Sequence, residues 1–241
     1  AYFALFAPDA RFVGTDAGEH WSRAEFEALY PGKVIGLPGD LSQMDEIKRL
    51  AETLAERETR LDVLVNNAGA AWGAEFDQFP EAGWDKVMDL NVKSLFFLTQ
   101  KLHGLLKAAA SVERPAKVIN IASIDGLRPN PWETYSYQAS KAAVIHLTRR
   151  MAARLIKDNI VVTCIAPGAY PSEMNKAAAR NPEASARGIP FKRVGVAEDI
   201  AGGAIYLASR AGDYVVGTTI PIDGGIVNAW IPETFQDPSG H

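Results

Sequence analysis

The sequence predicts an α/β fold, a doubly wound parallel sheet with helices on both faces. Short runs rich in Val and Ile alternate with longer segments of helical periodicity. The runs are apolar on both faces, as expected for parallel strands that helices cover from two sides. The length of 241 residues suits one large domain, residues 1–241, better than two small ones.

Each expected strand ends in a turn of small or polar residues. The strands are residues 33–37, 61–65, 116–121, 160–165 and 219–222. The turns are Gly39-Asp40-Leu41, Asn66-Asn67-Ala68-Gly69, Ala122-Ser123, Ala166-Pro167-Gly168 and Asp223-Gly224-Gly225. Because the carboxyl ends of parallel strands meet at one edge, we expect these turns to line a shared crevice that a ligand can approach closely.

Helices are expected between the strands, over residues 43–58, 84–110, 136–158 and 197–209. Ser42 and Asp45 are suitable caps for the first of them. Strand and helix in alternation, joined by right-handed crossovers, give the doubly wound arrangement.

The composition argues against several classes of binding partner. The net charge is −4 and no long basic run occurs, so neither nucleic acid nor an anionic membrane is an expected partner. No apolar stretch of about 18 residues predicts a transmembrane helix. The N-terminus does not resemble a signal peptide, so we expect a cytoplasmic protein. Cys164 is expected to be a buried structural thiol, and the scattered histidines predict no metal site.

Tyr137 and Lys141 form the first candidate catalytic pair. They lie four residues apart on an expected helix, so they share one face. A tyrosine phenol titrates near pH ~10. A cation one turn away favours the phenolate, so we expect Lys141 to lower the pKa of Tyr137. Such a tyrosine can exchange a proton with a carbonyl or alcohol, and Ser123 can hydrogen-bond the same oxygen.

Asn91 is polar within a long helical segment. We expect its side chain to have a task there, such as holding a water molecule that links to Lys141. Each of these residues alone is commoner on a solvated helix or in a plain turn. Together with the turns at the strand ends, they indicate a catalytic site.

With these residues, the chain from about residue 33 to 227 resembles the classical type of short-chain dehydrogenase/reductase. Within that family it is most similar to ketoacyl reductases of the rhamnolipid type. The resemblance is carried by Asn66-Asn67-Ala68-Gly69, Asn91, Ser123, Tyr137-Gln138-Ala139-Ser140-Lys141, Pro167-Gly168 and Ile222-Asp223-Gly224-Gly225. It implies a Rossmann-like fold for residues 33–241, and reduction of a carbonyl or ketoacyl substrate with NADP or NAD. It also implies a homodimer or homotetramer.

The resemblance also implies a role for each matching residue. Tyr137 would be the general acid/base, and Lys141 would lower its pKa and bind the nicotinamide ribose. Ser123 would orient the substrate carbonyl, and Asn91 would hold a relay water. The implied cofactor-binding residues are Asp40, Leu41, Asn67, Ala68, Gly69, Pro167, Gly168 and Ser172. Residues 169–192 would form a mobile substrate lid.

The chain departs from the family at its start, where a glycine-rich turn normally holds the cofactor pyrophosphate. Gly14 and Gly18 have the right spacing, but His20 replaces the last glycine. The carboxylates of Asp16 and Glu19 would repel a pyrophosphate.

Residues 1–32 instead resemble a fragment of a SnoaL-like domain. We expect residues 10–13 to fill the place of the family's first strand. Residues 22–29 are expected to cover it as a helix, because Ser22 and Glu25 form a capping box.

Two other functions remain open. Without a cofactor, Ser123 could act as a nucleophile with Tyr137 and Lys141 as its base, which would make the protein an esterase-like hydrolase. The Gly-x-Ser-x-Gly elbow of the usual hydrolases is absent. A non-catalytic scaffold would have no physical need for Tyr137 and Lys141 together.

Overall fold

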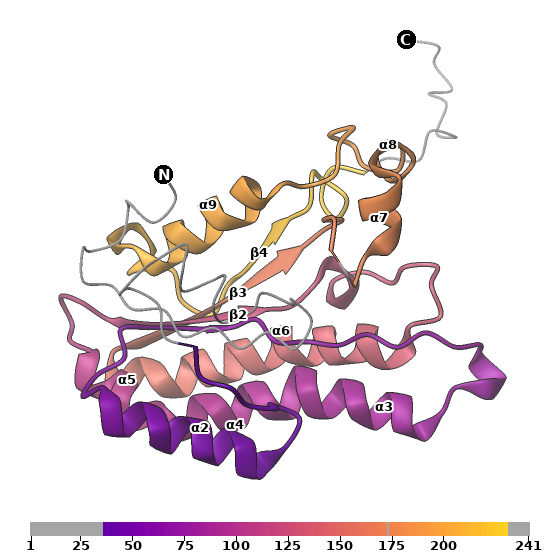
Figure 1. Ribbon diagram of the computed structural model, residues 1–241. Coiled ribbons are helices and arrows are strands. Elements are labelled where there is room, and N and C mark those ends of the chain that lie inside the picture. The colour runs from indigo at the N-terminus through magenta and orange to yellow at the C-terminus, as the bar shows by residue number, and fades with distance from the viewer. Residues whose placement is uncertain (1–35, 173, 231–241) are drawn as a thin grey trace.

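The computed structural model describes residues 36–172 and 174–230, which form a parallel sheet with helices on both faces (Figure 1). In this part of the chain the sheet has the order β1-β2-β3-β4, and every neighbouring pair is parallel. The strands are β1 (Val63–Asn66), β2 (Ala116–Ile121), β3 (Ile160–Pro167) and β4 (Thr219–Ile222). The predicted α/β fold is therefore confirmed.

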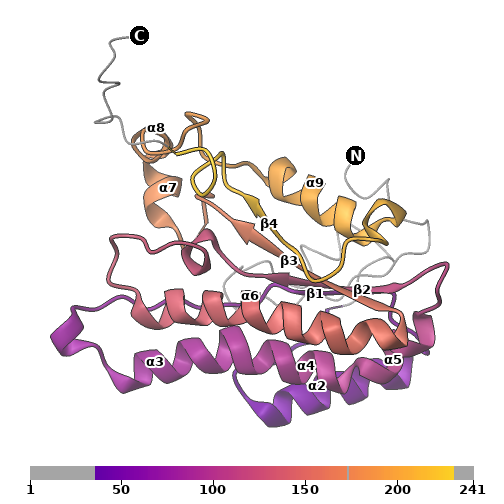
Figure 2. The ribbon, with the colours of Figure 1, turned by 180° about the vertical axis from the view of Figure 1, so that it is seen from behind.

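Helices α2 to α6 lie along one face of the sheet, and α9 lies along the other (Figures 1 and 2). The carboxyl ends of β3 and β4 point toward the short helices α7 and α8. The bounds are α2 (Met44–Arg57), α3 (Glu81–Met88), α4 (Ser94–Lys101), α5 (His103–Ala109), α6 (Tyr135–Leu155), α7 (Lys176–Arg180), α8 (Pro182–Ala186) and α9 (Ala197–Ala208).

The core has two parts because alternate residues of each strand face opposite sides of the sheet. Val118 and Val162 join the large cluster under α2, α4 and α6. Ile119 and Ile165 join the smaller cluster with Leu207 of α9. This explains why most positions of these strands are apolar. Cys164 is fully buried in the larger cluster, as expected.

Two expectations about elements are wrong, and a third is wrong at the two residues where the structure tests it. The long helix expected over residues 84–110 is α3, α4 and α5, with a π-helical turn (Asp89–Lys93) after α3 and a break at Leu102. Helix α2 starts after Gln43 without a side-chain cap, because the Ser42 hydroxyl donates instead to Asp40. Gly36 and Leu37 are in no strand, although residues 33–37 were expected to form one.

Residues 33–35, 10–13 and 22–29, together with Gly14 and Gly18, lie outside the described residues. Within residues 36–172 and 174–230, none of the helices has the length and apolar character needed to cross a membrane.

Candidate active site

Ser123 lies directly after β2 and begins the 3₁₀ turn Ile124–Gly126. Its Oγ accepts a hydrogen bond from the backbone N–H of Asp125 at 3.1 Å. The turn packs on the backbone of α6, since a Cβ added at Gly126 would lie 2.5 Å from the carbonyl carbon of Lys141. Only glycine fits such a close approach, so Gly126 is what allows Ser123 to lie against α6.

Tyr137 and Lys141 come from the first turns of α6 and meet Ser123 there. The Nζ atom of Lys141 lies 5.6 Å from the centre of the Tyr137 ring. It also donates to the backbone oxygen of Ile121, at the end of β2, at 3.0 Å. Tyr137 is hydrogen-bonded to Ser123. The structure thus brings together the three residues that the sequence singled out.

The expectation that the pKa of Tyr137 lies below its ordinary value is wrong. Burial raises the pKa of Tyr137 to about 12, and the hydrogen bond with Ser123 offsets this only in part. Burial also lowers the pKa of Lys141 to about 8. Tyr137 therefore keeps its proton at neutral pH and is placed to act as a proton donor.

Asn91 lies in the π-helical turn, a feature that often marks functional sites. Its Oδ1 accepts from the N–H of Ala70 at 2.7 Å, and its Nδ2 donates to the oxygen of Ala70 and to Ser140 Oγ, both at 2.9 Å. These hydrogen bonds fasten the turn after β1 to α6. That Asn91 holds a relay water stays a prediction.

That turn reaches the catalytic residues through Gly69. A Cβ added at Gly69 would lie 3.3 Å from Asn91 Oδ1 and 3.5 Å from Lys141 Nζ. Asn67 is exposed and Ala68 is half-buried. The expected ligand-binding turn therefore lies beside Lys141.

The turns after β3 and β4 also touch each other. The N–H of Gly168 donates to the oxygen of Ile222 at 3.0 Å, and a Cβ at Gly168 would lie 2.7 Å from the Cα of Asp223. Pro167 ends β3, and the exposed Ser172 accepts through its Oγ from the N–H of Asn175 at 3.0 Å.

Asp40 and Leu41 precede α2. The carboxylate of Asp40 is exposed and accepts from the hydroxyl and the N–H of Ser42, which lowers the pKa of Asp40. Leu41 is buried in the larger core cluster. The hydrogen bonds of Asp40 thus stay within its own turn.

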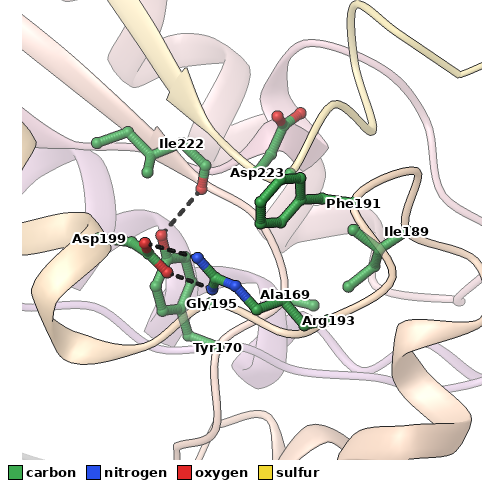
Figure 3. Close-up of a pocket in the computed structure, with 10 residues that line it drawn as sticks. Ala169, Tyr170, Ile189, Phe191, Arg193, Gly195, Asp199, Ile222 and Asp223 are labelled. Carbon is green, nitrogen blue, oxygen red and sulfur yellow. Dashed lines mark hydrogen bonds and ion pairs between the residues drawn. The ribbon is translucent and has the colours of Figure 1, made fainter.

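A cavity of about 290 Å³ lies next to the turns after β3 and β4, between the ends of these strands and the start of α9 (Figure 3). Arg193 spans one wall, where it pairs with Asp199 at 2.6 Å, and the hydroxyl of Tyr170 donates to the oxygen of Ile222 at 3.2 Å. Residues of the expected lid, including Phe191, form much of its lining. The lining includes neither Tyr137 nor Lys141, so this cavity does not contain the candidate catalytic residues.

Sequence reasoning missed Asp125, two residues after Ser123. Its carboxyl group is hydrogen-bonded to Asn130 and Ser123 and is attracted by Lys141, while burial raises its pKa. A carboxylate in a tight turn directly after a strand-end serine was a signal that could have found it.

The depressed pKa of Lys141 predicts how stability depends on pH. An unfolded chain keeps the lysine proton up to its ordinary pKa of 10.5, whereas the folded protein loses it near pH 8. Between these values the unfolded chain binds more protons, so the free energy of unfolding rises with pH. The full rise corresponds to about 3 kcal/mol, at ~1.4 kcal/mol per pH unit.

Replacing Lys141 with Met is expected to remove this rise. The measurement is urea unfolding of wild type and Lys141→Met between about pH 7 and about pH 10. Lys101→Met, at an exposed position of α4, serves as the matched control and should keep the wild-type slope. An unchanged slope in Lys141→Met would contradict the assignment.

Comparison with known proteins agrees with this architecture. The family model of enoyl-(acyl carrier protein) reductases matches residues 4–227. The chain is 46% identical over 197 residues to the rhamnolipids biosynthesis 3-oxoacyl-[acyl-carrier-protein] reductase of Pseudomonas aeruginosa, covering 80% of this chain and 77% of that protein. It is 36% identical over 204 residues to the 3-oxoacyl-[acyl-carrier-protein] reductase of Thermotoga maritima, covering 84% and 80%.

Solved structures give the same result. The Pseudomonas aeruginosa RhlG/NADP active-site complex superposes with a TM-score of 0.79 at 45% identity, over 83% of this chain and 79% of that one. A short-chain type dehydrogenase/reductase from Mycobacterium marinum gives 0.77 at 29% identity, over 85% and 80%.

The family match begins at residue 4 and so includes most of the segment with the SnoaL-like resemblance. That resemblance stays an expectation, and the segment lies outside the described residues. The fold, the residues that meet at α6 and the extent of these matches lead to one conclusion. The chain belongs to the short-chain dehydrogenase/reductase family and is an oxidoreductase.

Proposed function

We propose that the protein is an NAD(P)-dependent carbonyl reductase of ketoacyl substrates, with Tyr137 as the proton donor. The observation that carries this proposal is the meeting of the Tyr137 phenol with Ser123, to which it is hydrogen-bonded, while Lys141 Nζ lies 5.6 Å from the centre of the Tyr137 ring. The relative at 46% identity, a 3-oxoacyl-[acyl-carrier-protein] reductase, supports the substrate class.

The roles follow from the donors available. The hydroxyls of Ser123 and Tyr137 are the two groups that can hydrogen-bond one carbonyl oxygen, and such donors stabilise the charge that develops there. Tyr137 then gives its proton to that oxygen, which becomes the alcohol. Lys141 is charged below about pH 8 and favours the phenolate that remains.

The described part of the crevice fits a nicotinamide dinucleotide. The turn after β1 lies beside Lys141, since a Cβ added at Gly69 would come within 3.5 Å of Lys141 Nζ. A bound reduced nicotinamide would supply the hydride to the carbonyl carbon. The residues proposed to hold the dinucleotide are Asp40 and Leu41 at the adenine, Asn67, Ala68 and Gly69 along the cleft, Lys141 at the ribose, and Pro167, Gly168 and Ser172 at the nicotinamide.

The hydrolase alternative requires a base that removes the proton of Ser123. Burial raises the pKa of Tyr137 to about 12, so the phenol cannot take a proton from Ser123 at neutral pH. The Nζ atom of Lys141 donates to the backbone oxygen of Ile121 at 3.0 Å. This favours the reductase over the hydrolase.

The test begins with titration of the protein with NADPH and NADH, followed by quenching of tryptophan fluorescence. A 3-oxoacyl thioester is then added, and oxidation of the cofactor is followed. We expect saturable binding at micromolar cofactor and one cofactor oxidised per hydroxyacyl product, with Ser123→Ala binding the cofactor but reducing slowly. Absence of binding at millimolar cofactor, or cleavage of the thioester without it, would contradict the proposal.

A further inference from the structure

Ser123 has one hydroxyl proton, and several groups compete for it. A serine hydroxyl is a single donor with two acceptor lone pairs. One lone pair of Ser123 already accepts from the N–H of Asp125 at 3.1 Å. Carbonyl reduction needs the proton of Ser123 on the substrate oxygen. Any other acceptor beside Ser123 would therefore weaken the site.

Asp125 is such an acceptor. Its carboxyl group is hydrogen-bonded to Ser123 and lies within the electrostatic reach of Tyr137 and Lys141. The 3₁₀ turn that carries it lies against α6, where Gly126 packs on the backbone of Lys141. The carboxyl group of Asp125 thus stays beside the hydroxyl of Ser123.

Asn130 fixes the other side of this carboxyl group. The Oδ1 of Asn130 accepts from the N–H of Trp132 at 2.8 Å and from Nε2 of Gln138 at 3.1 Å. The remaining polar group of the Asn130 side chain is Nδ2, which can only donate, and this side chain is hydrogen-bonded to Asp125. Gln138 follows Tyr137 in α6, so a chain of contacts runs from α6 through Asn130 and Asp125 to Ser123.

We propose that Asp125 is a positioning residue whose carboxyl group decides whether the proton of Ser123 points toward Asp125 or toward the substrate carbonyl. As a carboxylate, Asp125 accepts the Ser123 proton and leaves Tyr137 as the sole donor to the substrate. As a neutral acid, Asp125 donates its own proton to Ser123 Oγ, and the hydroxyl of Ser123 is available to the substrate. The proton of Asp125 stays on Asp125 throughout. This inference rests on the proposed carbonyl reduction.

The groups that face Asp125 determine the pH at which its carboxyl group gains or loses its proton. Burial raises the pKa of Asp125, against the lowering effects of Asn130, Lys141 and Ser123. From α6, Tyr137 is neutral over the working range and Lys141 is charged below about pH 8. Behind Lys141, burial raises the pKa of the Cys164 thiol of β3, so it too is neutral. Reduction should therefore speed up as the pH falls through the raised pKa of Asp125.

The protonation of Asp125 is measured without any cofactor, by infrared difference spectroscopy of wild type against Asp125→Asn. We expect the band of a protonated carboxyl group to titrate above the ordinary range of aspartate. Asn130→Ala removes a donor to Asp125, so it should move this midpoint to higher pH. Asp85→Asn, an exposed aspartate of α3, is the matched control and should leave the band unchanged.

The pH profile of carbonyl reduction tests the consequence. An asparagine amide donates to Ser123 at every pH. The kcat of Asp125→Asn should therefore lack the fall that wild type shows as the pH rises through the pKa of Asp125. Above that pKa, the kcat values of variant and wild type should differ by up to about 10²-fold. A merely structural role would lower kcat of the variant at every pH and leave the profile unchanged.

The outcomes separate the two proposals. The same profile in wild type and Asp125→Asn, or a carboxyl band that titrates at the ordinary aspartate range, would overturn the role of Asp125 while reduction itself stands. No reduction by wild type at any pH would overturn the proposed function, and this role with it.

Discussion

Replacing Tyr137 with Phe is expected to lower kcat for carbonyl reduction by about 10²- to 10⁴-fold, the usual contribution of a positioned proton donor. The change removes one oxygen atom and leaves the ring beside Lys141 in place. The lost hydrogen bond with Ser123 should cost only about 1 kcal/mol of stability, so the variant should stay folded. Cofactor oxidation under single-turnover conditions measures the effect on the chemical step.

Tyr135→Phe provides the matched control on the same helix. Its hydroxyl donates to Glu133 at 3.1 Å near the protein surface and faces away from Ser123. We expect near wild-type kcat for this variant. Equal losses in the two variants would trace the effect to the start of α6 as a whole, and full activity in Tyr137→Phe would place the proton donor elsewhere.

The strands were predictable because their cause is local. A strand covered by helices on both faces must be apolar at successive positions, and this is visible in residues 116–121 and 219–222, which match β2 and β4. The strand β3 runs on to Pro167, two residues beyond its apolar run, and β1 begins two residues later than expected. The meeting of Ser123, Tyr137 and Lys141 was also predictable from local patterns. Ser123 follows a strand end, and Tyr137 and Lys141 have the spacing of one helix face.

The electrostatics of the site were not predictable from spacing. The spacing of Tyr137 and Lys141 indicated a lowered pKa for the tyrosine, but burial decides the sign. Burial depends on the packing of the turn at Gly126 against α6, which joins parts of the chain that no local pattern connects.

The break in the expected helix over residues 84–110 has a similar origin. Within it, the hydroxyls of Ser94 and Thr99 donate to backbone oxygens four residues earlier, and Asn91 bonds to the turn after β1. Such contacts bend or widen a helix without changing its apolar periodicity. Periodicity therefore located the helical segment but not its division into α3, α4 and α5.

Replacing Asn91 with Ala is expected to destabilise the protein by about 2–4 kcal/mol, because it leaves several buried polar groups without partners. Asn91 is only 2% exposed, and its amide bonds to both backbone groups of Ala70 and to Ser140 Oγ. The turn after β1, including Gly69, would lose its attachment to α6. Cofactor affinity should therefore fall together with the free energy of unfolding.

Two further variants test the cause. Asn91→Asp keeps an acceptor for the N–H of Ala70 but places a negative charge against the oxygen of Ala70, so it should be at least as damaging as Asn91→Ala. Asn181→Ala removes an exposed asparagine that caps α8, which should cost ~1 kcal/mol. Urea unfolding of the three variants gives the comparison. Asn91→Ala could instead lower the free energy of unfolding by no more than Asn181→Ala. In that case the amide of Asn91 would not be what holds the turn after β1, including Gly69, beside Lys141.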